Sequence, residues 1–140
     1  MRYWDASVLV SLCVAEDGTA ASRRLARQPI VTWALSLVEI ASAIERRRRE
    51  GALTGSEHTA AKTAVAELAE SWTEIASLAA VRERSVRLLA THTLRAADAL
   101  QLAAALVAVS DRPAGHEFVC TDRQLREAAA REGFAVLPGD

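Results

Sequence analysis

The chain has 140 residues, of which 51% are hydrophobic, and its formal net charge at neutral pH is −1. This length allows one domain with its own core and is too short for two ordinary domains, so we expect a single domain over residues 1–140. The nearly balanced charge excludes an overall basic field, so any binding of nucleic acid must depend on a local patch.

The same sequence predicts a cytoplasmic protein without membrane contact. Asp5 lies where a secretory signal would need an apolar run. The longest apolar run, residues 102–109, is far shorter than the roughly 20 residues that cross a bilayer. Cys13 and Cys120 lack the spacing of a zinc site, and two cysteines give no disulfide framework.

Short apolar segments alternate with helical patterns along the chain. In chain order we expect strands at residues 2–4, 29–32, 72–78, 117–121 and 134–137. We expect helices at residues 7–15, 18–28, 36–50, 56–71, 79–92, 94–109 and 122–133. This alternation predicts a three-layer α/β/α domain, in which helices cover both faces of a parallel sheet of four to five strands.

Four carboxylates are expected at one edge of this sheet. In a doubly wound sheet, the carboxyl ends of the strands and the amino ends of the helices share the edge where ligands bind. Asp5 and Asp122 follow strands, and Glu39 and Asp98 lie in the first turns of helices. With strand order 3-2-1-4-5, all four flank the point where the order reverses. Their mutual repulsion implies a cation, and oxygen ligands favour Mg²⁺ or Mn²⁺ over zinc.

Each acid also has a structural interpretation. Glu39 follows Ser36 at the spacing of a helix-capping box, which recurs at residues 54/57 and 71/74.

The other three acids suit helix starts whatever their chemistry. The helix dipole favours Asp98 and Asp122, and Asp5 could cap the helix after it. However, Asp98 heads the most apolar stripe of its helix, which runs to Val109. A charge at that position, together with four acids at one edge, favours a functional site.

Four segments together resemble PIN-domain ribonucleases, especially the VapC toxins of type II toxin-antitoxin pairs. They are YWDASVLV at residues 3–10, SLVEIASAIERRRREGAL at 36–53, LRAADALQLAAAL at 94–106 and FVCTDRQLREAAAREGF at 118–134. The resemblance covers nearly the whole chain. It implies an endoribonuclease that depends on Mg²⁺ or Mn²⁺ and leaves 5′-phosphate and 3′-hydroxyl ends.

The resemblance also implies roles for single residues. Asp5 and Asp98 correspond to the main direct metal ligands, whereas Glu39 and Asp122 correspond to acids that act through waters or a second metal. Ser7 matches the hydroxyl residue of the opening D-x-[ST] motif, which holds a water or a phosphate; a helix N-cap explains Ser7 equally well.

Three further features lie beside these acids. The family often has Ser or Thr two residues before its fourth acid; here that residue is Cys120, and the hydroxyl lies at Thr121. Arg95 could neutralise the acids, contact an RNA phosphate or form a salt bridge with Asp98. The run Arg46 to Arg49 ends a helix ~15–20 Å from the acids, so we expect mainly a solvated structural role, with distal RNA contact as the alternative.

The resemblance implies a homodimer and a small VapB-type antitoxin over the acidic cleft, with residues 7–15 and 63–72 offering apolar surface. A PIN-like binding module with little hydrolysis and a non-toxin PIN nuclease are the alternatives. A receiver domain is disfavoured because its late catalytic lysine is absent; the single lysine is Lys62. A haloacid-dehalogenase-like phosphatase would need an acid where Ser7 stands.

Overall fold

The computed structural model describes residues 1–14 and 20–139. Its strands are β1 (Arg2–Trp4), β2 (Val31–Trp33), β3 (Thr73–Ile75), β4 (Glu117–Val119) and β5 (Ala135–Leu137). Its helices are α1 (Ala6–Cys13), α2 (Ala20–Leu25), α3 (Ser36–Arg49), α4 (Gly55–Ser71), α5 (Leu78–Thr91), α6 (Ala96–Ala108) and α7 (Arg123–Glu132).

The five strands form one parallel sheet in the order β3-β2-β1-β4-β5, which confirms the predicted topology. Tyr3 of β1 lies opposite Val31 in β2 and Phe118 in β4. The pairing continues past β1, because the Asp5 amide donates to the Val119 carbonyl at 3.0 Å. The order reverses at β1, so Asp5 leaves the sheet at the reversal point.

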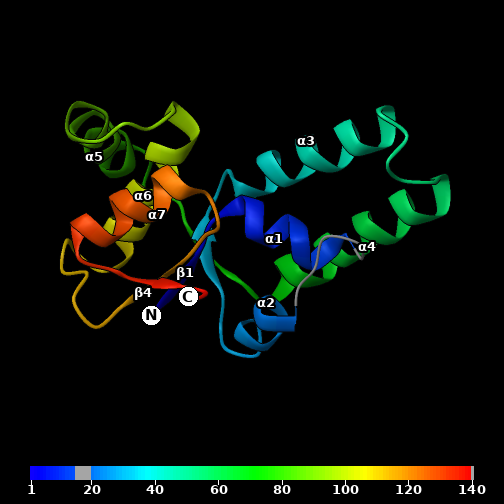
Figure 1. Ribbon diagram of the computed structural model, residues 1–140, viewed down its shortest axis with the longest axis horizontal. Coiled ribbons are helices and arrows are strands. Elements are labelled where there is room, and N and C mark those ends of the chain that lie inside the picture. Colours follow the sequence, from blue (N-terminus) through cyan, green and yellow to red (C-terminus); the bar gives the residue numbers. More distant parts are fainter. Residues whose placement is uncertain (15–19, 140) are drawn as a thin grey trace.

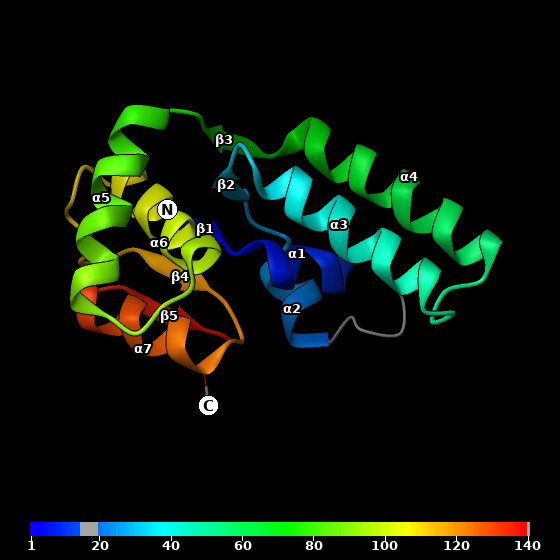
Figure 2. The same cartoon turned by 90° about the horizontal axis from the view of Figure 1, so that it is seen from above.

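Helices cover both faces of the sheet, as Figures 1 and 2 show, and each face has its own core. Tyr3 and Phe118 pack with α5, α6 and α7 on one face. Trp4 and Val119, the next residue of each strand, pack with α1, α3 and α4 on the other, because successive strand side chains point to opposite faces. The helices α3 and α4 extend side by side away from the sheet (Figures 1 and 2).

Helix α6 lies in the first of these cores. Residues 101–106 are all buried, and alanines at 103, 104 and 105 let neighbouring elements approach closely. The stripe from Asp98 through Leu102 to Val109 is buried along its length, as the sequence predicted. The core therefore fixes α6, and with it the position of Asp98 in its first turn.

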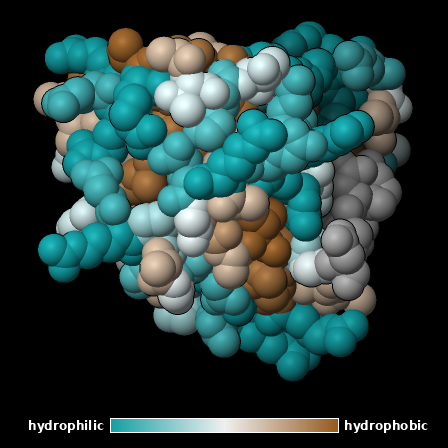
Figure 3. All heavy atoms as spheres, turned by 60° about the vertical axis from the view of Figure 1, so that its left-hand side comes forward, coloured by the Kyte–Doolittle hydropathy of each residue, from teal (hydrophilic) through white to brown (hydrophobic). Residues whose placement is uncertain are grey.

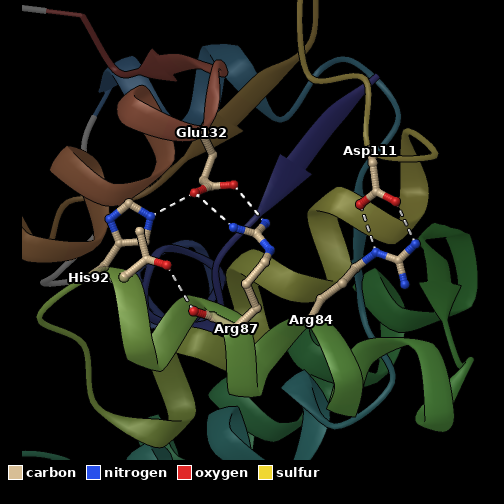
Figure 4. A network of polar contacts seen from close by, with 6 residues as sticks. Arg84, Arg87, His92, Asp111 and Glu132 are labelled. Carbon is tan, nitrogen blue, oxygen red and sulfur yellow. Dashed lines mark hydrogen bonds and ion pairs between the residues drawn. The ribbon is translucent and has the colours of Figure 1, made fainter.

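Ion pairs connect the helices on this side of the sheet (Figure 4). Glu132 of α7 accepts from Arg87 Nη2 of α5 at 2.8 Å and from His92 Nε2 at 2.7 Å. Arg84 of α5 donates to both carboxylate oxygens of Asp111, at 2.7 and 2.6 Å. The first group joins α5 to α7, and the second holds the turn after α6.

Several predicted bounds differ from the structure. The second strand covers 31–33 rather than 29–32, and the third is shorter than 72–78 because Leu78 already begins α5. Predicted helical residues 15, 18 and 19 lie outside the described residues, as does Asp140 of the predicted domain. Among the residues that the structure describes, no helix is long and apolar enough to cross a membrane.

Only one of the three predicted capping boxes forms. The Thr54 side chain accepts from the Glu57 amide, and the Glu57 side chain accepts from the Thr54 amide. The box at Ser36 is wrong, because the Ser36 hydroxyl is buried and hydrogen-bonds Thr32 instead. The box at 71/74 is wrong because Ser71 ends α4 rather than beginning a helix.

The face in Figure 3 is mostly hydrophilic, with hydrophobic residues gathered in patches between hydrophilic ones.

The two predicted partner-binding helices, α1 and α4, contribute none of the large exposed hydrophobic side chains that the structure describes. Those side chains are Leu35, Leu37, Val38, Leu78, Val86 and Leu89, on or beside α3 and α5. The apolar patterns of α1 and α4 mainly reflect core packing.

Candidate active site

A cavity of about 690 Å³ lies at the carboxyl edge of the sheet, between α1, α3, α6 and the start of α7. All seven of the residues that the sequence singled out for this site line it, namely Asp5, Ser7, Glu39, Arg95, Asp98, Thr121 and Asp122. The four acids come from four different segments, which the strand order brings together. The predicted convergence of carboxylates at one edge therefore occurs.

Asp5 is the most buried of these acids. It follows β1 at the position before α1, but its side chain does not cap that helix; it accepts a hydrogen bond from the Ser7 hydroxyl. The pKa of Asp5 is raised from 3.8 to about 7, mainly by burial and further by the nearby carboxylates of Glu39 and Asp98, while hydrogen bonding to Ser7 opposes the increase. Ser7 lies inside α1, so the N-cap interpretation of Ser7 is wrong.

A buried polar network holds Glu39. The Gln101 Nε2 group of α6 donates to Glu39 Oε2 and, at 3.1 Å, to Ser36 Oγ. The Tyr3 hydroxyl donates to Gln101 Oε1 at 2.6 Å. Burial raises the pKa of Glu39, the hydrogen bond from Gln101 lowers it, and the charge of Asp98 raises it. Gln101 thus connects the sheet to one acid of the cavity.

Asp98 and Arg95 form an ion pair across one turn at the start of α6. Arg95 Nε lies 3.3 Å from Asp98 Oδ2, and the Arg95 side chain is 80% exposed whereas that of Asp98 is 12% exposed. An ion pair with so exposed a cation contributes little to stability. Because the Arg95 guanidinium remains in solvent, exchanging Asp98 for another anion costs little.

Asp122 has a structural role as well as its place in the cavity. Its Oδ2 accepts from the Leu125 amide at 3.0 Å and so caps α7. Thr121 is exposed beside it, whereas Cys120 is buried, and burial raises the pKa of the Cys120 thiol above its ordinary value. The residue of this segment that carries a hydroxyl and lines the cavity is therefore Thr121, one position after Cys120.

The donor set suits a hydrated divalent cation better than a fully protein-ligated one. Within residues 1–14 and 20–139, no three or more His, Cys, Asp or Glu side chains form a group that could hold a metal ion. Mg²⁺ is usually bound by one or two carboxylates and several waters, so two converging aspartates are sufficient. Among the described residues, the side chains that line the cavity offer carboxylate and hydroxyl oxygens and no thiol or imidazole, and such donors disfavour zinc.

The sequence pattern was not used to assign Gln101 to the site, and it placed Arg46 too far from the acids. Gln101 is a polar residue three positions after Asp98 in an otherwise apolar helix, and that break in the pattern was its signal. Arg46 lines the cavity, although the arginine run was expected to lie far from the acids. It follows Glu39 by seven residues, which is two helical turns and returns to the same helix face.

A parallel sheet with an acid-lined cavity at the point where its strand order reverses defines a doubly wound α/β protein with a candidate acidic site. The family model of the PIN domain matches residues 2–131. This match spans nearly the whole chain, so the protein belongs to the PIN-domain family. PIN domains are typically nucleases, and PIN nucleases generally use divalent metals. No curated protein matches the chain.

Proposed function

We propose that this protein is an endoribonuclease that depends on Mg²⁺ or Mn²⁺ and acts as the toxin of a VapBC-type pair. The observation that carries the proposal is the convergence of Asp5, Glu39, Asp98 and Asp122 on one cavity of a PIN-family chain. These four acids share no structural role, because among them Asp122 alone caps a helix with its side chain.

Asp5 and Asp98 are the proposed metal ligands, and Glu39 and Asp122 are proposed to act through waters or a second ion. When bound, a divalent ion supplies positive charge that lowers the pKa of water and offsets charge on phosphate oxygens. Burial is the largest cause of the raised pKa values of Asp5 and Glu39, and neighbouring carboxylates add to both; a bound cation would offset that added repulsion.

Two other residues, Ser7 and Gln101, orient these carboxylates through hydrogen bonds. Ser7 donates to Asp5 and fixes the direction of one oxygen. Gln101 does the same for Glu39 from the buried side of the cavity. In an open cavity next to solvent, such fixed hydrogen bonds keep an acid in position before a substrate arrives.

The toxin role rests on the resemblance to VapC proteins, which also implies a homodimer and a VapB-type antitoxin in the cytoplasm. Exposed apolar side chains beside the cavity support a protein partner there. Val38, which lines the cavity, is 63% exposed, and Leu35, one turn earlier at the start of α3, is 48% exposed. These two residues are the proposed part of the antitoxin contact that lies next to the acids.

The proposal is tested by inducing the chain alone in a bacterial host, beside Asp98→Asn and Glu127→Gln variants at matched expression. Glu127 is an exposed carboxylate of α7 outside the cavity, so it controls for loss of one negative charge. We expect growth arrest with the original chain and with Glu127→Gln, and normal growth with Asp98→Asn.

Equal arrest by all three chains would contradict hydrolysis and favour the PIN-like binding module. Absence of arrest with the original chain, at confirmed expression, would contradict the toxin role. RNA from arrested cells, sequenced from its 5′-phosphate ends, would identify the target and separate a toxin from a PIN nuclease with another role.

A further inference from the structure

The four arginines at the end of α3 have different environments. Successive residues of a helix are about 100° apart, so four consecutive side chains point in all directions. Arg47 Nη1 donates to the Ala43 carbonyl at 3.3 Å, and Arg48 Nη1 donates to the Leu53 carbonyl at 3.2 Å. Arg46, in contrast, lines the cavity that contains the acids.

The cavity continues along one face of α3. Its lining from this helix is Val38, Glu39, Ser42, Ala43 and Arg46, which recur every three to four residues. At about 1.5 Å per residue, the backbone of Arg46 lies ~10 Å along the helix from that of Glu39. Helix α1 packs against α3 and adds Ala6, Ser7 and Val10 to the lining. The cavity is therefore a groove between α1 and α3 that leads from the acids toward Arg46.

The charges in this groove are unevenly paired. The Arg95 side chain contacts Asp98. The Arg46 guanidinium, in contrast, makes no hydrogen bond or ion pair with any residue that the structure describes; the backbone carbonyl of Arg46 accepts from the Glu50 amide within the helix end. Arg46 is exposed, so keeping its guanidinium solvated costs little. A cation without a protein partner, two turns from a group of carboxylates, is placed to receive an anion from outside the chain.

We propose that Arg46 binds a backbone phosphate of the RNA strand beside the cleaved position, so that the strand runs along the groove between α1 and α3. This inference rests on the proposed function. Arginine suits the task because its planar guanidinium donates two parallel hydrogen bonds to a phosphate. The small side chains of Ala6, Ser42 and Ala43 leave room for the strand and offer few groups that read bases. The contact therefore positions the backbone and does not select sequence.

The test compares Arg46→Ala, Arg46→Lys and Arg49→Ala for binding and cleavage of a short single-stranded RNA of mixed sequence. Arg49 is an exposed member of the same run and does not line the cavity, so it is the matched control. Binding is measured by fluorescence anisotropy in the Asp98→Asn background at several salt concentrations. Cleavage with Mn²⁺ is measured in the original background.

We expect Arg46→Ala to weaken RNA binding about 10-fold, because it removes hydrogen bonds between charged groups. The slope of log affinity against log salt concentration should become shallower by about 0.7, the value for one contact to a single strand. In cleavage, the change should appear mainly as a higher KM. Arg46→Lys should recover part of the affinity. Arg49→Ala should change the affinity by less than about 2-fold, because Arg49 is an exposed charge outside the groove and is screened by salt.

Equal effects of Arg46→Ala and Arg49→Ala, with the same salt slope, would overturn the inference. If the original chain cleaves RNA and Arg46→Ala binds and cleaves RNA equally well, the proposed function stands and the Arg46 contact is wrong. If no chain cleaves RNA but Arg46→Ala binds it more weakly than Arg49→Ala, the nuclease proposal fails and the Arg46 contact stands.

Discussion

At the scale of single residues, Gln101 connects the core to the candidate active site. It is buried in α6, accepts from the Tyr3 hydroxyl of β1 and donates to Glu39 of α3. Three elements that are far apart in sequence therefore meet at one side-chain amide. A buried amide with partners on both sides is costly to replace, because each partner left behind loses its hydrogen bond.

We predict that Gln101→Leu lowers the free energy of unfolding by about 1–3 kcal/mol, the cost of unsatisfied buried polar groups. Tyr3→Phe, combined with Gln101→Leu, should recover part of that loss, because it removes the Tyr3 hydroxyl that Gln101→Leu leaves without a hydrogen-bond partner. Urea unfolding of the two single variants and the double variant measures the coupling. Strictly additive effects of the two substitutions would show that the Tyr3–Gln101 hydrogen bond contributes nothing.

The acids of the site could be predicted from sequence, whereas the contacts of Gln101 could not. Asp5, Glu39, Asp98 and Asp122 follow from element order, because the fold assigns strand ends and helix starts to one edge. The role of Gln101 depends on which side chains of β1 and α3 face it. Such contacts are set by packing between distant segments, which local patterns do not contain.

At the scale of elements, α5 and α7 are joined by the ion pair of Glu132 with Arg87 and by the hydrogen bond of Glu132 with His92 (Figure 4). The side chains of His92 and Glu132 are largely buried, and that of Arg87 is half-exposed. The hydrogen bond from Arg87, followed by that from His92, lowers the pKa of Glu132 below its ordinary value of 4.5. The ionised form of Glu132 therefore stabilises the folded state.

We predict that Glu132→Gln lowers the free energy of unfolding at neutral pH by about 1 kcal/mol, since it weakens partly exposed charged hydrogen bonds. Because folding lowers this pKa, the stabilisation is complete above the unfolded value of 4.5 and disappears as the pH falls through the lower folded value. The difference from the original chain should thus shrink below about pH 4. Thermal unfolding measured across this pH range checks the prediction.

Glu127→Gln is the control, because Glu127 pairs with Arg123 within α7 and both side chains are more than half exposed. It should change stability by less than about 0.5 kcal/mol. A loss with Glu127→Gln as large as that with Glu132→Gln would contradict a specific connection between α5 and α7.

Element order and type were predictable from hydrophobic periodicity, whereas the three predicted capping boxes were correct at one position and wrong at two. The capping box at Thr54 is solvent-exposed, so local chemistry decides it. The same spacing at Ser36 lies at the carboxyl edge of the sheet, where Thr32 and Gln101 compete for the hydroxyl. At the start of α3, these tertiary partners therefore override the local capping pattern.

At the scale of the whole molecule, the two cores fix the sheet from both sides and leave its carboxyl edge open. The predicted strand order was the one that brings the four acids together, and the structure confirms it. The chemistry of the site depends on whether its carboxylates bind a cation and whether the groove binds RNA.

The most direct test of this account is cleavage of purified bacterial RNA by the purified protein, with Mg²⁺, with Mn²⁺, and with excess EDTA. We predict cleavage with either metal, 5′-phosphate ends on the products and no cleavage in EDTA. Asp98→Asn, confirmed to be folded by circular dichroism, should be at least about 100-fold slower, a typical loss when a charged group of a reaction site is removed. Cleavage that persists in EDTA, or an Asp98→Asn rate equal to that of the original chain, would contradict the proposal that the acids of this cavity perform metal-dependent hydrolysis.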